Sequence, residues 1–176
     1  MGVDRYRRSH PVGRVGDDGG VAVWQPPRIP ASAGALLHDG AGGILVLKPT
    51  YKAGWVVPGG QIEEDGESPW EACRREVHEE TGLEVTSGRL VCVDFLHPRP
   101  GRPGGLRFLF ECGEVGPAAR AGIVLQTGEI AEHRWASPDE AAGLLSGPVR
   151  RRVARSLGAR RPVYLEDGHP VGAVDV

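Results

Sequence analysis

The sequence lacks a long apolar run and a strong net charge. No apolar stretch approaches the ~18 residues that a membrane-spanning helix needs, and none follows the first charged residues as it would in a secretory signal. The net charge of -2 provides no field that would attract nucleic acid or a membrane surface. We therefore expect neither a membrane partner nor a nucleic-acid partner.

Cysteine is also scarce, and its positions are far apart. Cys73, Cys92 and Cys112 each stand in apolar surroundings, and an odd number of cysteines cannot pair completely. This usage fits reduced, buried thiols better than a disulfide framework or a zinc site. We therefore expect a cytoplasmic location.

The chain is long enough for one domain with a substantial core. It has 176 residues, of which 40% are hydrophobic and 25% are charged. Residues 1–30 mix Arg, Asp, Gly and Pro with few apolar positions, so we assign them to a mobile N-terminal lead. The domain is expected over residues 31–160, and residues 161–176 are assigned to a C-terminal tail.

Apolar runs bounded by Gly, Pro and Asp predict a sheet. Strands are expected at residues 32–38, 42–49, 54–60, 88–97, 105–112, 122–126 and 129–137. Ser137 opens a capping box for a short helix through Leu145, and an apolar residue at every fourth position predicts a last helix over residues 149–157. A mixed sheet with a few helices belongs to the α+β class.

The best-defined element is a helix over residues 69–81. Ser68 is its expected N-cap, Pro69 takes the first helical position, and Glu71 completes a capping box. Gly82 supplies the left-handed residue that ends the helix.

Three glutamates crowd one flank of this helix, beside the apolar stripe that faces the core. Glu76 and Glu80 are like charges four residues apart, which costs about 0.2–0.5 kcal/mol. With Glu79 they occupy the last turns, where the helix dipole disfavours each anion by about 0.3–1 kcal/mol. A solvated charged face is one interpretation. The other is a bound cation, and oxygen ligands alone select a hard ion, Mg2+ or Mn2+.

The segment "GGQIEEDGESPWEACRREVHEETGL" resembles the Nudix box, in which Gly, five residues, Glu and seven residues precede Arg-Glu-apolar-x-Glu-Glu-x-Gly-apolar. Every fixed position from Glu67 to Leu83 matches. One departure exists, because six residues separate Gly60 from Glu67. "WVVPGG" before the box and "EIAEHRWASPDEAAGLL" near the end of the chain extend the resemblance to the MutT-like hydrolases of this family.

The resemblance implies an α/β/α sandwich around a mixed β-sheet and hydrolysis of a diphosphate linkage. The implied substrate is a small-molecule nucleotide diphosphate: a nucleoside diphosphate joined to another group, as in ADP-ribose, a nucleotide sugar or a nucleoside triphosphate. By motif position, Glu76, Glu79 and Glu80 would be Mg2+ ligands and Glu67 an outer-sphere helper, while Arg75 would orient a glutamate.

The general base is left open between two glutamates. One is Glu79 in the box, and the other is Glu129 in the later loop "QTGEIAEHRW". Gly60, Lys48 and Lys52 are the candidate substrate contacts, although solvated loop lysines are the simpler interpretation of the last two.

Two alternatives compete with the hydrolase. A catalytically silent, nucleotide-sensing Nudix-like module would be expected to lose a box glutamate, and none is lost. A diphosphate isomerase would need a cysteine at the site, and Cys92 and Cys112 stand inside expected strands. Pro98 stands at a spacing that resembles ADP-ribose-hydrolysing members, but its segment holds several prolines. The basic stretch over residues 149–161 is interpreted as a solvated helix face, and a homodimer is left open.

Overall fold

The computed structural model describes residues 28–64, 66–172 and 174. Its strands are β1 (Ala31–His38), β2 (Ile44–Pro49), β3 (Gly59–Gln61), β4 (Arg89–Leu96), β5 (Gly105–Glu114), β6 (Ile130–Ala136), β7 (Val163–Glu166) and β8 (His169–Pro170). Its helices are α1 (Pro69–Thr81), α2 (Pro117–Ala121), α3 (Pro138–Leu144) and α4 (Gly147–Ser156). Most of the expected N-terminal lead, residues 1–27, lies outside the described residues.

The strands form one mixed sheet in the order β6-β2-β1-β5-β4-β7-β8. β1 runs parallel to β5, whereas β2 and β6, and β4 and β5, pair antiparallel. β3 pairs with the first half of β1, at Ser32 to Gly34, and β2 meets β1 only at His38. β2 and β3 therefore pair with different parts of the same edge of β1. Gly59 and Gly60 of β3 lie at the gap between the two strands.

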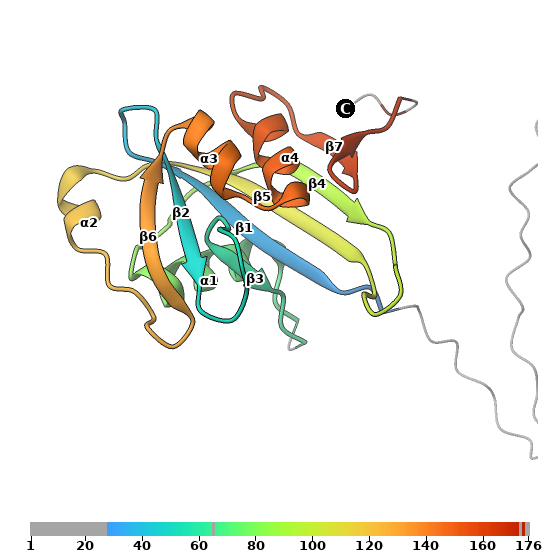
Figure 1. Cartoon of the computed structure of the whole chain (residues 1–176), viewed down its shortest axis with the longest axis horizontal. Helices are drawn as coiled ribbons and strands as arrows, with labels where there is room; N and C mark the ends of the chain where they lie inside the picture. Colours follow the sequence, from blue (N-terminus) through green and yellow to red (C-terminus); the bar gives the residue numbers. More distant parts are fainter. Residues whose placement is uncertain (1–27, 65, 173, 175–176) are drawn as a thin grey trace, which may run out of the picture.

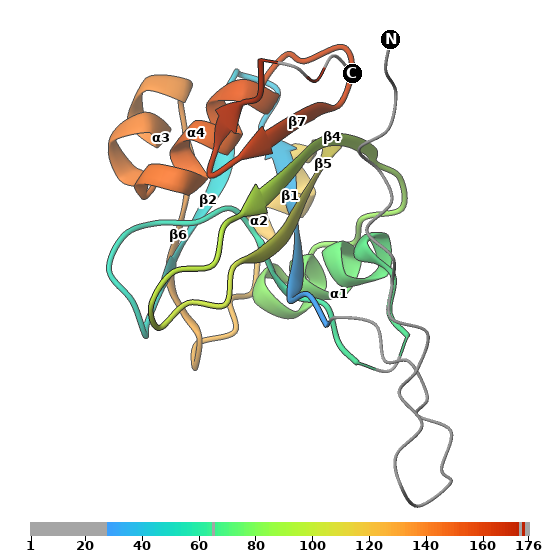
Figure 2. The same ribbon diagram turned by 90° about the vertical axis from the view of Figure 1, so that its right-hand side faces the viewer.

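Helices cover both faces of this sheet, with α1 on one face and α3 and α4 on the other (Figures 1 and 2). The side chains of β1 alternate accordingly: Ala33, Ala35 and Leu37 pack in the cluster under α1, and Leu36 packs in the cluster under α3 and α4. Both faces of the central strands are thus buried. The expected α/β/α sandwich around a mixed β-sheet is confirmed.

Two expected elements differ in the structure. Residues 122–126 form no strand, because Val124 and Gln126 donate their backbone N–H groups to the carbonyls of Thr81 and Glu80 at the end of α1. This segment therefore satisfies helix carbonyls instead of joining the sheet. The strand expected over residues 54–60 is reduced to isolated bridges at Trp55 and Val56, followed by β3.

The segment assigned to a C-terminal tail also contributes to the sheet. β7 pairs parallel with β4 from Cys92 to Phe95, and β8 pairs with β7. Leu165 of β7 is buried in the core under α3 and α4. Within the described residues, no helix is long and apolar enough to cross a bilayer.

Candidate active site

Helix α1 has the bounds and caps that the sequence predicts. Ser68 accepts a hydrogen bond from the Glu71 N–H, and the Glu71 carboxylate accepts one from the Ser68 N–H. Gly82 ends the helix in the left-handed conformation, at φ 70°. Because Cys73 and Val77 are fully buried against the sheet, the acidic flank of the helix is turned toward β3.

Glu80 is the most deeply buried of the three glutamates, with 5% of its surface exposed. Its Oε2 accepts a hydrogen bond of 2.8 Å from the Gly59 N–H. Burial raises the pKa of Glu80 to about 8, and the negative charges of Glu76 and Glu129 add to the rise, while the Gly59 bond opposes it. An ionised carboxylate at this position therefore lacks sufficient compensation from the protein alone.

Glu76 lies directly against the backbone of β3. A Cβ atom at Gly60 would stand 2.2 Å from Oε1 of Glu76, so only glycine leaves room for the carboxylate. Gly59 is similarly constrained, since a Cβ there would meet the Ala33 carbonyl oxygen at 2.3 Å. Burial raises the pKa of Glu76, although Arg75 opposes this effect. The two glycines thus permit Glu76 and Glu80 to reach the internal edge of the sheet.

Arg75 binds several carboxylates at once. Its Nε and Nη2 donate to the two oxygens of Glu67 at 2.7 and 3.0 Å, and its Nη1 donates to Glu76 and Glu79, both at 3.0 Å. Its Nη2 also donates to the Gln61 carbonyl at 2.9 Å. The guanidinium holds the pKa of Glu67 below its ordinary value. Arg75 therefore contacts Glu67, Glu76 and Glu79 together and partly offsets their mutual repulsion.

Glu129 is brought to the same place from a distant part of the chain. Its carbonyl accepts a hydrogen bond of 2.8 Å from the Thr50 N–H, which holds the loop before β6 at the end of β2. The negative charge of Glu129 contributes to the raised pKa values of Glu76, Glu80 and Tyr51. The two candidate bases therefore differ in setting, because the side chain of Glu79 is 45% exposed and bound to Arg75.

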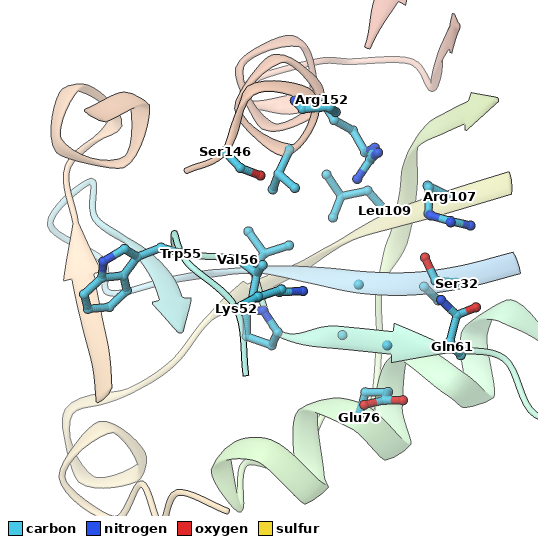
Figure 3. Close-up of a pocket in the computed structure, with 18 of the residues that line it drawn as sticks. Ser32, Lys52, Trp55, Val56, Gln61, Glu76, Arg107, Leu109, Ser146 and Arg152 are labelled. Atoms are coloured by element: carbon cyan, nitrogen blue, oxygen red, sulfur yellow. The ribbon is translucent and has the colours of Figure 1, made fainter. Parts of the chain in front are cut away.

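A cavity of about 810 Å³ opens between the acidic flank of α1 and helix α4 (Figure 3). Its acidic end is lined by Glu76, Glu80 and Glu129, together with Gly60 and Lys52. The remaining predicted residues, Lys48, Glu67, Arg75 and Glu79, are not in its wall. Cys92 and Cys112 also lie outside this wall, and burial raises the pKa of Cys92 to about 11, which gives the isomerase alternative no reactive thiol.

Across the described ranges, no group of three or more His, Cys, Asp or Glu side chains stands ready to hold a metal ion. The reason is visible in the contacts, since Arg75 holds oxygens of Glu76 and Glu79 and the Gly59 N–H holds Glu80. The donor set nevertheless suits a hard divalent cation, because all of its atoms are oxygens. Gly59 and Gly60, called the glycine cradle below, leave room for the carboxylates of Glu76 and Glu80 side by side.

The opposite end of the cavity carries residues that the sequence analysis missed. Arg107 of β5 and Arg152 of α4 both line it, and Arg152 is bound to the fully buried Asp94 of β4. Arg152 is therefore no part of a solvated helix face, contrary to the interpretation of the basic stretch. Its position three residues after Val149 places it beside that residue on the same side of α4.

Comparison with known protein families identifies the family of the chain. The family model of the NUDIX domain matches residues 28–157. The chain belongs to the Nudix family. The resemblance inferred from the box is thereby confirmed, and the chain is a hydrolase of this pyrophosphatase class. No curated protein sequence matches the chain significantly.

Solved structures of this family are similar to the chain. A MutT protein from Methanosarcina mazei Go1 is 27% identical, with a TM-score of 0.57 over 70% of this chain and 88% of that one. A MutT protein from Bacillus halodurans is 24% identical, with a TM-score of 0.62 over 77% and 87% of the two chains. The Nudix domain of Shewanella oneidensis NrtR, crystallised with ADP ribose, shares the fold at 14% identity, with a TM-score of 0.63 over 76% and 92%.

Proposed function

We propose that this Nudix hydrolase is a Mg2+-dependent pyrophosphohydrolase that cleaves the diphosphate bond of a nucleoside diphosphate linked to another moiety. One observation carries the proposal: Glu76, Glu80 and Glu129 converge with Gly60 at one end of a cavity of about 810 Å³. A cavity of this size accommodates a nucleotide derivative. The free thiols Cys73, Cys92 and Cys112 support a cytoplasmic location within this proposal.

The residues of α1 would hold the cation. Glu76, Glu79 and Glu80 would supply the carboxylate oxygens, and Glu67 would assist through its two hydrogen bonds with Arg75. Mg2+ bound there would neutralise charge on the diphosphate and acidify a coordinated water. Mn2+ has the same preference for oxygen ligands and would substitute for it.

Glu129 is the better candidate for the general base. It lines the cavity, whereas Glu79 is engaged with Arg75 outside the cavity wall. A base must reach the attacking water directly, so position favours Glu129. Its loop is also fixed through the backbone bond to Thr50, which would keep the carboxylate at the acidic end. Lys52, at the same end, would contact a substrate phosphate.

The proposal is tested by product identification. The protein is incubated with ADP-ribose, a nucleotide sugar and a nucleoside triphosphate, each with Mg2+ and with EDTA, and the products are separated by chromatography. We expect at least one of these compounds to be cleaved between its phosphorus atoms only when Mg2+ is present. Equal rates in EDTA would overturn the metal requirement, and binding without turnover would favour the silent sensor.

A pair of variants tests the assignment of the base. Glu129→Gln should lower kcat by about 10²–10⁴-fold, the usual contribution of a positioned base. Glu132→Gln is the matched control, because Glu132 stands three residues away and pairs with Arg134 outside the cavity. A Glu129→Gln variant within threefold of wild type would refute the assignment and return Glu79 to consideration.

A further inference from the structure

The two ends of the cavity carry opposite charge. Glu76 projects into it from α1 at one side, while Arg107 from β5 and Arg152 from α4 project into it at the other (Figure 3). Arg102, in the loop between β4 and β5, also lines the cavity. Mg2+ and the scissile diphosphate account for the acidic end, and nothing in the proposed reaction accounts for the basic end.

The carboxylate nearest to these arginines is already fully used. Asp94 is completely buried, and its Oδ2 accepts hydrogen bonds of 3.0 and 2.9 Å from Nε and Nη2 of Arg152. Its Oδ1 accepts a bond of 2.9 Å from the Gly168 N–H. Asp94 therefore fixes the orientation of Arg152, and the two neighbouring guanidinium groups share the negative charge of this one carboxylate.

Arg107 makes no ion pair with any of the described residues. Its Nη1 donates to the Leu106 carbonyl at 2.8 Å and to the Pro30 carbonyl at 3.5 Å, and its Nη2 donates to the Gly104 carbonyl at 3.5 Å. Burial lowers the pKa of Arg107, and the positive charge of Arg152 lowers it further, while the negative charge of Asp94 opposes the shift. A half-buried guanidinium beside a second one, with one shared carboxylate, is an arrangement that an anion would stabilise.

The sheet sets the spacing between β5, which carries Arg107, and β3, which carries the glycine cradle. Arg107 is in register with Ser32 of β1, and Ser32 is in register with Gln61 of β3, the residue after Gly60. Two strand spacings of about 4.8 Å therefore separate Arg107 from the strand that bears the glycine cradle. The strand backbones at the two ends of the cavity therefore lie roughly 10 Å apart in the plane of the sheet, which leaves room for part of a substrate between them.

We propose that Arg107, oriented beside the Arg152–Asp94 pair, forms an anion subsite that selects diphosphate substrates with a second anionic group, a phosphate or a carboxylate, beyond the scissile bond. This inference rests on the proposed function and narrows its substrate class. Arg107 is the residue that would contact the anion. Asp94 is a positioning residue, since it acts only through Arg152.

Two pairs of probe compounds test this subsite. The members of each pair differ by one anionic group, which is a phosphate in one pair and a carboxylate in the other. NADP carries a phosphate that NAD lacks, and UDP-glucuronate carries a carboxylate where UDP-glucose has a hydroxymethyl group. Dissociation constants are measured by calorimetry in EDTA, and kcat/KM is measured with Mg2+. We expect the wild-type protein to prefer the anionic member of at least one pair by tenfold or more in binding.

Arg107→Gln should reduce this preference to within twofold, while Arg107→Lys should keep most of it because the charge remains. Arg155→Gln is the matched control, since Arg155 is an exposed arginine of α4 that does not line the cavity. It should leave the preference unchanged. Thermal unfolding of each variant confirms that the fold is retained, and Arg107→Met, which also removes the charge, decides the question if the Gln variant unfolds.

The outcomes of the two assays separate this inference from the proposed function. A binding preference that Arg107→Gln abolishes supports the subsite even if no probe is hydrolysed, in which case only the proposed reaction fails. Mg2+-dependent hydrolysis with no preference in either pair overturns the subsite alone. A preference that persists in Arg107→Gln also overturns it, because another group would then be reading the charge.

Discussion

Replacing Glu80 by Gln should stabilise the metal-free protein. Burial raises the pKa of Glu80 from its ordinary 4.5 to about 8. An acid with a raised pKa loses its proton more readily in the unfolded chain, so its destabilising effect is absent below pH 4.5 and grows until pH 8. At about 1.4 kcal/mol per pH unit, the cost of Glu80 at pH 7 is about 3 kcal/mol. Glutamine removes this cost, and its side-chain oxygen can still accept the bond from Gly59.

The assay is chemical denaturation of both proteins in EDTA at several pH values. Glu80→Gln should exceed wild type by about 3 kcal/mol at pH 7, and the difference should vanish near pH 4.5. In Mg2+ the difference should shrink to nearly zero, because a ligand at 100 times its Kd stabilises the wild type by about 2.7 kcal/mol. Glu84→Gln is the control, and at 69% side-chain exposure it should alter stability by less than about 1 kcal/mol with or without Mg2+. A metal-free Glu80→Gln protein less stable than wild type would refute the reasoning.

Three further changes probe the cradle, the buried ion pair and a pH-dependent contact. Gly60→Ala should push the Glu76 carboxylate aside and raise the Mg2+ concentration for half-maximal activity by about 10–100-fold; an unchanged requirement would contradict the cradle. Arg152→Met should leave the buried Asp94 unpaired and cost about 3–5 kcal/mol in urea denaturation, where a loss under 1 would be inconsistent. The hydrogen bond with the Glu111 carboxylate raises the pKa of His38 above 6.5. This contact therefore stabilises the fold below pH 6.5, and the stabilisation is lost as the pH rises through the pKa of His38 in the folded protein. His38→Gln should flatten that slope, and an unaltered pH profile would count against it.

The elements that could be predicted from sequence are those whose signals are local. The bounds of α1 follow from Ser68, Pro69 and Gly82, which fix the helix ends without reference to the rest of the fold. β7 carries no such signal, since a short strand that pairs parallel with distant β4 depends on the packing of the whole sheet. Residues 122–126 have the composition of a strand, but the N–H groups of Val124 and Gln126 donate to the free carbonyls at the end of α1 instead of to a neighbouring strand.

The site likewise contains residues that a local motif predicts and residues whose position depends on the whole fold. The box identifies Glu76, Glu79 and Glu80, but their unequal burial depends on β3, which the sequence presents only as two glycines after a proline. The convergence of Glu129 with them depends on hydrogen bonds across the end of β2, from the backbone and the side chain of Thr50 to the loop before β6. Arg107 could not be recognised as part of the site, because a lone arginine in an apolar strand does not reveal which face it occupies.

The carboxylates of α1 are proposed to hold a divalent cation at the acidic end of the cavity. Titration of the metal-free protein with Mn2+, followed by electron paramagnetic resonance, measures this binding without any assumption about substrate. Wild type should bind the ion, Glu76→Gln should bind it at least about tenfold more weakly, and Glu84→Gln, which alters only an exposed contact with His78, should match wild type. Equal Mn2+ affinity in all three proteins, or no binding in any, would contradict the account.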